Sequence, residues 1–303
     1  MEILAISDIY GKCNILEDLL FFHVQKRQST KRITIIAGDL GIHPERVQYQ
    51  HKIEQIFNVL SEVSEFIVYV PGDTDSKKLD VQSHNIINVD KSYKVINIEN
   101  MSLGIFGLGG AVKNSVREGE PTPYLWDENI PLVRDRLTTE LKINVEKVML
   151  ERPDFAILVT HSPPYGIADL SKPVTLNEML LLHEIATEEE GAEETEEENE
   201  IEKKKEKPKY MSPRRLGSRL VRNFIKYYQP DLHIFGHVHK QGGKQRTLGD
   251  TLCFNVSHLS PMPYKLTGHK FLVITLQRGK ISPEFDNAVH KNLDFDTFIE
   301  TYI

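Results

Sequence analysis

The residues Gly236-His237-Val238-His239 follow an apolar run at 232–235, and they decide how the rest of the chain is interpreted. Two histidines two positions apart in a turn that begins with glycine are difficult to explain by packing, because buried polar side chains need partners. Four earlier segments also carry a carboxylate or an imidazole where an apolar, β-branched run gives way to Gly, Pro or polar residues, the pattern of a strand end. These segments are Ser7-Asp8-Ile9-Tyr10-Gly11, Gly38-Asp39, Pro71-Gly72-Asp73-Thr74-Asp75 and Thr160-His161-Ser162-Pro163. Five strand ends are therefore predicted to bring six metal ligands to one site.

The length and composition favour a single intracellular domain. A chain of 303 residues has room for one large α/β domain or two small ones, and the candidate ligands run from Asp8 to His239, which favours one domain over 1–303. No apolar run approaches 18 residues and no basic-then-apolar signal begins the chain, so a soluble, cytoplasmic protein without a membrane span is expected. The two cysteines, Cys13 and Cys253, lack zinc or redox spacing and are expected to be small core residues.

The net charge of −7 comes mainly from one segment. Residues 187–210 contain 11 Glu and 5 Lys, which leaves the remainder of the chain close to neutral. This segment has no apolar periodicity and cannot bury enough surface to offset its ordering entropy, so it is predicted to be a mobile insertion. A solvated helix with Glu and Lys pairs four residues apart is the alternative, and a protein partner could dock there.

Apolar runs alternate with helical patterns in the N-terminal half, which predicts βαβ units. Strands are expected at 2–7, 32–37 and 66–70, with helices at 15–26 and 51–61. The runs at 85–89, 94–98 and 103–106 are predicted as antiparallel or edge strands of a second sheet layer. The C-terminal half is predicted to contain helices at 131–148 and 219–228, strands at 155–160 and 232–235, and strands at 252–256 and 271–276 that complete the second sheet.

A pair of divalent cations suits this ligand set. Two cations a few ångström apart can clamp the attacking and leaving oxygens of an in-line displacement at phosphorus, and they lower the pKa of bound water. Such a pair needs carboxylate and imidazole ligands with little thiolate. A lone Asp at a strand end is usually a helix cap or a turn residue, so Asp8, Asp39 and Asp73 carry little weight singly. Their fixed order ahead of the two terminal histidines is what indicates a metal site.

The motifs in this order resemble the calcineurin-like metallophosphoesterase superfamily, whose pattern is Asp-x-His, Gly-Asp, Gly-Asn-His-Asp/Glu, a lone His and Gly-x-His. The chain is more narrowly similar to predicted phosphoesterases found in archaea, over about residues 1–280 apart from the insertion. The resemblance implies an α/β fold, a four-layer α/β/β/α sandwich in which two mixed sheets are flanked by helices. The further stretches that carry it are Gly109-Gly110 with Thr122-Pro123, Thr160 to Gly166, and Gly217-Ser218 through Tyr228-Gln229-Pro230.

The resemblance also implies roles for single residues. Asp39 would bridge two divalent cations, which could be Mn, Fe, Zn or Ni. Asp8 and His239 would hold one cation. Asp73, His161 and His237 would hold the other. The implied catalytic set is Asp39, Asp73, Thr74 and His161.

The chain departs from the superfamily pattern at Tyr10, where Asp8-Ile9-Tyr10 stands in place of Asp-x-His. A tyrosine phenolate binds ferric iron well and softer divalent ions poorly. His43, four residues after Asp39, is a second candidate for the missing nitrogen ligand. The remaining alternatives are a water ligand or a weak first cation.

A second departure is Thr74, where the superfamily has the histidine that contacts the phosphate and protonates the leaving group. A threonine hydroxyl is too weak an acid for that role near neutral pH. Three outcomes stay open: another histidine acts as the acid, substrates with good leaving groups need none, or catalysis is weak. The candidate acids are His43, His84 and His258.

The expected function is a dinuclear metal-dependent phosphohydrolase, a phosphodiesterase or phosphomonoesterase in which metal-activated hydroxide attacks phosphorus in line. The alternative is a catalytically weakened or inactive protein that keeps the fold as an interaction scaffold. Small phosphate esters, nucleotides among them, are the expected substrates, and Thr74, Lys77 and Tyr124 are candidates for binding them. A nucleic-acid groove is not indicated, because the chain has no net excess of positive charge beside its one arginine cluster at 214–222.

Overall fold

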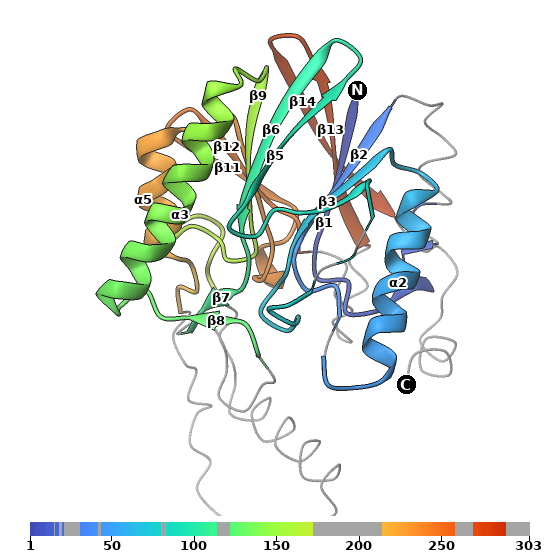
Figure 1. Ribbon diagram of the computed structural model, residues 1–303, viewed down its shortest axis with the longest axis horizontal. Helices are drawn as coiled ribbons and strands as arrows, with labels where there is room; N and C mark the ends of the chain where they lie inside the picture. The colour runs from blue at the N-terminus through green and yellow to red at the C-terminus, as the bar shows by residue number, and fades with distance from the viewer. Residues whose placement is uncertain are drawn as a thin grey trace, which may run out of the picture.

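A computed structural model describes residues 1–14, 16–17, 20, 31–41, 44–79, 81, 83–113, 122–171, 214–257 and 269–288. Two six-stranded mixed sheets pack face to face in it, and helices cover both outer faces (Figure 1). The predicted four-layer α/β/β/α sandwich is confirmed. No helix in the described part of the chain is both long and apolar enough to span a membrane.

The first sheet has the order β14-β13-β1-β2-β3-β4. Its four strands β1 to β4 run parallel, while β13 is antiparallel to β1 and β14 is antiparallel to β13. Every residue of β1 and β2 is buried, as expected for parallel strands covered on both faces. The bounds are β1 Glu2–Ile6, β2 Arg32–Ala37, β3 Phe66–Val70, β4 Ile86–Asn88, β13 His269–Gln277 and β14 Lys280–Ala288.

The second sheet has the order β11-β12-β10-β9-β6-β5, in which the four inner strands are parallel and the two edge strands are antiparallel to their neighbours. A separate two-stranded sheet, β7-β8, lies near its lower end in Figure 1. The bounds are β5 Tyr93–Ile98, β6 Met101–Leu108, β7 Ala111–Val112, β8 Leu125–Trp126, β9 Phe155–Thr160, β10 Leu232–Phe235, β11 Lys244–Leu248 and β12 Thr251–Asn255.

Helix α2 (Gln48–Ser61) covers the first sheet, and helices α3 (Pro131–Leu150) and α5 (Arg219–Tyr228) cover the second (Figure 1). Helix α5 begins where the Ser218 hydroxyl accepts a hydrogen bond from the Val221 amide, which satisfies one of the free N–H groups of the first turn. A short 3-10 turn, η2 (His239–Gln241), follows β10.

Three apolar layers hold these elements together, and strand β1 shows how the sequence divides between them. Ile3 and Ala5 point into the core between the two sheets, whereas Leu4 and Ile6 pack toward α2. Successive side chains of a strand point to opposite faces, so a continuous apolar run serves two layers at once. A third layer fills the space between the second sheet and helices α3 and α5.

Two strand assignments from the sequence were wrong. The run at 85–89 was expected in the second sheet, but β4 pairs with β3 as a parallel edge strand of the first. The run at 271–276 was also expected there, but β13 pairs with β1. Both sheets bury both of their faces, so an apolar run does not specify which sheet it joins. Strands β7, β8, β11 and β14 were not predicted.

Two other predictions cannot be compared with the structure. The helix expected at 15–26 lies mostly outside the described residues, and the insertion at 187–210 lies wholly outside them. A single domain over 1–303 stays a prediction.

Candidate functional site

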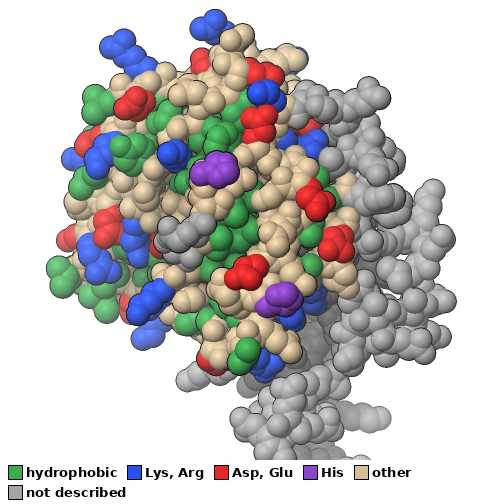
Figure 2. Space-filling view, turned by 45° about the vertical axis from the view of Figure 1, so that its right-hand side comes forward, with side chains coloured by type: hydrophobic (Ala, Val, Ile, Leu, Met, Phe, Trp, Pro, Cys, Tyr) green, Lys and Arg blue, Asp and Glu red, His purple; other side chains and the backbone are tan. Residues whose placement is uncertain are grey.

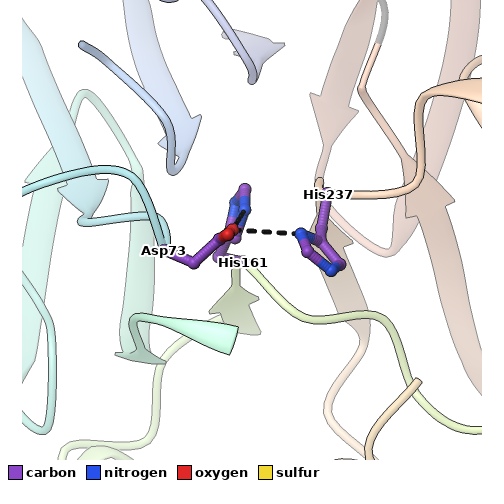
Figure 3. Close-up of side chains that lie close together, drawn as sticks. All are labelled: Asp73, His161 and His237. Carbon is purple, nitrogen blue, oxygen red and sulfur yellow. Dashed lines mark hydrogen bonds and ion pairs between the residues drawn. The ribbon is translucent and has the colours of Figure 1, made fainter. Parts of the chain in front are cut away.

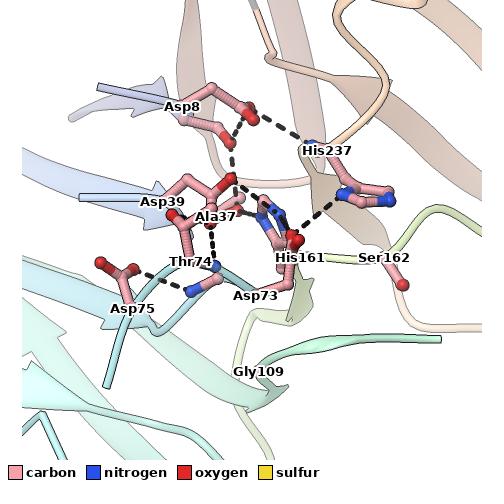
Figure 4. Close-up of polar contacts among 12 residues, drawn as sticks. Asp8, Ala37, Asp39, Asp73, Thr74, Asp75, Gly109, His161, Ser162 and His237 are labelled. Carbon is pink, nitrogen blue, oxygen red and sulfur yellow. Dashed lines mark hydrogen bonds and ion pairs between the residues drawn. The ribbon is translucent and has the colours of Figure 1, made fainter. Parts of the chain in front are cut away.

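The candidate ligands lie just beyond the carboxyl ends of parallel strands in both sheets (Figure 4). Asp8, Asp39 and Asp73 follow β1, β2 and β3 of the first sheet, while His161 and His237 follow β9 and β10 of the second. Parallel strands of one sheet end at the same edge, which is where open α/β sheets bind ligands. The face-to-face packing of the two sheets joins these edges into one cluster.

The first group of ligand atoms belongs to Asp73, His161 and His237, which converge from both sheets (Figure 3). Oδ1 of Asp73 lies 2.7 Å from Nε2 of His161 and 3.0 Å from Nδ1 of His237. A cation held about 2.0–2.2 Å from each ligand needs ligand atoms roughly 3 Å apart. The spacing and the mixed carboxylate and imidazole chemistry therefore fit a divalent cation.

His161 is fully buried, and a hydrogen bond to the backbone fixes its orientation. Its Nδ1 lies 2.8 Å from the carbonyl oxygen of Ala37, so that nitrogen donates to the backbone and Nε2 remains the ligand atom. Burial alone would lower the pKa of His161, but the carboxylates of Asp39 and Asp73 outweigh it and raise that pKa well above its usual value. The site therefore attracts positive charge.

The second group of ligand atoms belongs to Asp8, Asp39 and His161, so His161 is shared by both groups. Nε2 of His239 lies 3.0 Å from Oδ1 of Asp8, although His239 is in neither group. Burial would raise the pKa of Asp8, but the nearby imidazoles of His239 and His161 lower it strongly. The Ser7 hydroxyl also donates to Asp8.

Four residues of this cluster adopt left-handed backbone conformations, which are uncommon for residues other than glycine. The φ angles are 61° at Asp8, 53° at Tyr10, 53° at Asp39 and 73° at His237. Such strain persists where the surrounding structure enforces it, and it concentrates at functional sites. The turn at His237 directs its imidazole toward Asp73, while the imidazole of His239 faces Asp8.

Tyr10, at the first departure from the superfamily pattern, lies among the ligands. Its hydroxyl is 2.9 Å from Oδ2 of Asp39, 3.0 Å from Nε2 of His239 and 3.4 Å from Oδ1 of Asp8. Burial and the neighbouring carboxylates, Asp39 first, raise the pKa of Tyr10 well above its usual value. His43, the other candidate for this position, lies outside the described residues.

Thr74, at the second departure, contacts Asp39. Its backbone amide lies 3.1 Å and its hydroxyl 2.9 Å from Oδ1 of Asp39, and the hydroxyl is also 2.7 Å from the carbonyl oxygen of Gly41. These contacts hold Asp39, a candidate ligand, and the substrate contact expected for Thr74 stays a prediction. Of the other histidines proposed as acids, His84 is exposed, and His43 and His258 lie outside the described residues.

Asp75 and Tyr49 support the site, and the sequence did not reveal how. The Asp75 carboxylate accepts hydrogen bonds from the backbone amides of Leu40, Gly41 and Gly72 and from the Tyr49 hydroxyl. It therefore ties the loop that carries Asp39 to the loop that carries Asp73. Burial, and then the charge of Asp39, raise the pKa of Asp75 to about 6.

Tyr124, a candidate for binding substrate, is buried and its hydroxyl is engaged. That hydroxyl donates to Asp90 and accepts from Lys91, while the backbone amide of Tyr124 donates to the carbonyl oxygen of Asp73. The exposed Lys77 places its Nζ 5.8 Å from the centre of the Tyr124 ring. Tyr124 thus supports the Asp73 loop, and Lys77 supplies a cation beside it.

The surface charge is mixed. Figure 2 shows Lys and Arg side chains interspersed with Asp and Glu over the face drawn. In the cluster at 214–222, Arg215 pairs with Asp169 at 2.9 Å and Arg222 donates to the carbonyl oxygen of Tyr165. These two arginines therefore hold the loop after β9, and the described residues of this face form no continuous basic stripe.

Comparisons with known proteins agree with this architecture. The protein TT1561 of Thermus thermophilus shares 16% identity and a TM-score of 0.54, over 94% of this chain and 98% of that one. The phosphopantetheinyl hydrolase PptH of Mycobacterium tuberculosis shares 14% identity and a TM-score of 0.45, over 84% of this chain and 88% of that one. At 16% identity, the similarity to TT1561 supports the fold alone, and nothing follows from the match to PptH. A search of curated proteins finds no match.

A family model provides the stronger comparison. The model described as calcineurin-like phosphoesterase matches residues 1–241, a span that includes all five strand ends and both terminal histidines. The chain therefore belongs to the calcineurin-like phosphoesterase family, a family of metal-dependent hydrolases that act on phosphate esters.

Proposed function

We propose that this protein hydrolyses small phosphate esters by in-line attack at phosphorus, with the cluster at the strand ends as its active site. The observation that carries the proposal is the pair of ligand groups that share His161, each with its ligand atoms within 4.8 Å of one another. Nε2 of His161 can bind only one cation, because its Nδ1 donates to Ala37, so the two groups that meet there mark two adjacent cation positions that a carboxylate such as Asp39 would bridge. The residues that would hold them are Asp8, Asp39, Asp73, His161, His237 and His239.

When divalent cations are bound, they supply an activated water and stabilise the charge that develops on the phosphoryl oxygens. The protein has to keep the ligands in place and face them toward the substrate. Asp39 is held from two sides, because Tyr10 donates to Oδ2 and Thr74 donates to Oδ1. His161 is held by the carbonyl oxygen of Ala37. Ligands fixed in this way need little rearrangement during the reaction.

Phosphate esters with good leaving groups fit this site best. The Thr74 hydroxyl is directed at Asp39 and the Gly41 carbonyl, and a hydroxyl is in any case a poor acid near neutral pH. We infer that Lys77, exposed beside Tyr124, neutralises part of the substrate's negative charge. We therefore favour substrates whose departing oxygen needs no proton, such as aryl esters, phosphoanhydrides or nucleotide-like esters.

The test is metal-dependent hydrolysis by the purified full chain. The metal-stripped protein is reconstituted separately with Mn²⁺, Zn²⁺, Ni²⁺ or Fe²⁺ and assayed on matched aryl phosphomonoesters and phosphodiesters. Turnover that requires the cation and is lost in Asp39→Asn supports the proposal. Cation binding without turnover on any of these esters would favour the alternative, an interaction protein that keeps the fold and the metal.

A further inference from the structure

The Tyr10 hydroxyl contacts every ligand expected at one of the two cation positions. Its distances are 2.9 Å to Oδ2 of Asp39, 3.0 Å to Nε2 of His239 and 3.4 Å to Oδ1 of Asp8. By contrast, no hydrogen bond joins this hydroxyl to Asp73, His161 or His237 in the described part of the structure. The two positions therefore differ in whether a protein hydroxyl already engages their ligands.

The tyrosine is held in this position by its own backbone and ring. The Tyr10 amide donates to the carbonyl oxygen of Asp39 at 3.1 Å, and the left-handed φ of 53° turns the side chain into the cluster. Its ring packs edge-on against the His239 imidazole, with 5.7 Å between ring centres. Removing the hydroxyl from the ligands therefore requires a movement of the ring against its packing.

The position of His239 is consistent with a Tyr10 hydroxyl that lies between His239 and Asp39. His239 lies outside both groups of closely spaced ligand atoms, although its Nε2 is 3.0 Å from Asp8. The Tyr10 hydroxyl links His239 to Asp39, which belongs to the second group. In this arrangement the hydroxyl makes the connection that a cation between His239 and Asp39 would make.

We propose that Tyr10 acts as a latch on the Asp8–Asp39–His239 position. The chain fills the Asp73–His161–His237 position first, and a second cation binds only when the Tyr10 hydroxyl is displaced from its three partners. This inference rests on the proposed function, since it concerns the order in which that site acquires its metals. The hydroxyl has one proton, which it donates to the Asp39 carboxylate, and a hydrogen bond to a charged partner is worth roughly tenfold in affinity, so the two steps should differ by about tenfold or more.

The test is a Mn²⁺ titration of the metal-stripped full chain, monitored by calorimetry and by the electron paramagnetic resonance of free Mn²⁺. The native protein should bind one cation tightly and a second more weakly, by about tenfold or more. Tyr10→Phe removes the hydroxyl and keeps the ring, so it should tighten the weak step about tenfold or more and leave the tight step unchanged. Tyr10→His, which offers an imidazole, should also bring the two steps together. Tyr227→Phe, at an exposed position on α5, is the matched control.

A weaker second binding step in Tyr10→Phe, instead of a tighter one, would overturn the inference. If Tyr10→Phe weakens or abolishes the second step, the hydroxyl is a ligand instead of a latch. Two steps of equal affinity in the native protein, or loss of both steps in Tyr10→Phe and Tyr10→His, would equally contradict it. The proposed function fails separately, through absence of cation-dependent hydrolysis in the native protein, whatever the order of binding.

Discussion

The hydroxyl of Thr74 lies 2.9 Å from Oδ1 of Asp39, and the backbone amide of Thr74 lies 3.1 Å from the same oxygen. The other oxygen of that carboxylate, Oδ2, accepts from the Tyr10 hydroxyl at 2.9 Å. The two positions at which this chain departs from the superfamily pattern therefore meet on one carboxylate. Both substitutions replace an imidazole with a hydroxyl that holds Asp39.

Thr74→Val should show whether the Thr74 hydroxyl acts by holding Asp39 or by taking part in the reaction itself. Valine keeps the shape but removes the hydroxyl, so Asp39 loses one donor. We expect cation affinity to fall about 10- to 100-fold, as for other residues that orient metal ligands, and stability to fall by about 1–3 kcal/mol. Thr74→Ser, which keeps the hydroxyl, should stay near the native values. Mn²⁺ titration and urea unfolding measure both effects, and native cation affinity in Thr74→Val would refute the role.

Gly72→Ala should damage the site without replacing a ligand. A Cβ at Gly72 would fall onto the carboxylate and amide of Asp39, so the carboxylate has to move. We expect hydrolysis and cation affinity to drop by more than about tenfold, the lower end of the effect of disturbing a ligand's support. Gly279→Ala is the control, because it has a left-handed φ of 72° but no atom within 4 Å of the added Cβ. Equal losses in the two variants would mean that the effect is general destabilisation.

The loss of stability with rising pH should disappear when metal binds. His161 and His239 have pKa values raised above 6.5 in the folded protein, mainly because nearby carboxylates outweigh burial. Their stabilising contribution is therefore complete below pH 6.5 and is lost as the pH rises through the folded values. The metal-free protein should lose stability above pH 6.5, while cation affinity rises over the same range because cations and protons compete for these nitrogens.

Chemical unfolding at a series of pH values, with and without saturating Mn²⁺, measures this dependence. The falling slope should disappear in the presence of the cation. The same falling slope with saturating Mn²⁺ would show that the two imidazoles do not bind metal.

The rate of hydrolysis should depend steeply on the leaving group of the ester. Thr74 cannot donate a proton to the departing oxygen, and His233 is buried, with its pKa lowered to about 3 by desolvation. Aryl esters should therefore be cleaved faster than matched alkyl esters by about 10²–10⁴-fold beyond their solution difference, the usual contribution of a general acid. Steady-state rates on a series of phosphodiesters measure this. Equal rates for aryl and alkyl esters would show that another residue supplies the proton.

The order of motifs predicted that the six residues meet at the strand ends, and the family resemblance that it carries implied the fold. That prediction was possible because parallel strands of a sheet end at the same edge, so residues that directly follow these strands are expected to lie close together. Strands at 32–37, 66–70, 155–160 and 232–235 have the predicted bounds. The assignment of 271–276 to the second sheet was wrong, because burial on both faces hides which neighbour a strand pairs with.

The supports of the site could not be predicted in the same way. Asp75 accepts hydrogen bonds from three backbone amides and the Tyr49 hydroxyl. Every residue except proline has a backbone amide, so the sequence does not show which amides a side chain will reach. The direction of the Thr74 hydroxyl depends on the backbone carbonyl of Gly41, and the sequence does not show that contact either. Side-chain type indicated which positions were unusual, and only the three-dimensional contacts indicated what they do.

The most direct measurement is cation-dependent hydrolysis of an aryl phosphodiester by the native chain and by Asp39→Asn, with bound metal determined in the same samples. Asn keeps the size of the side chain but removes the charge of the carboxylate that we propose bridges the two cation positions. The account predicts turnover by the native protein only with divalent cation, and a loss of more than about 100-fold in Asp39→Asn together with reduced metal content. Turnover that persists in Asp39→Asn, or that does not depend on added cation, would contradict it.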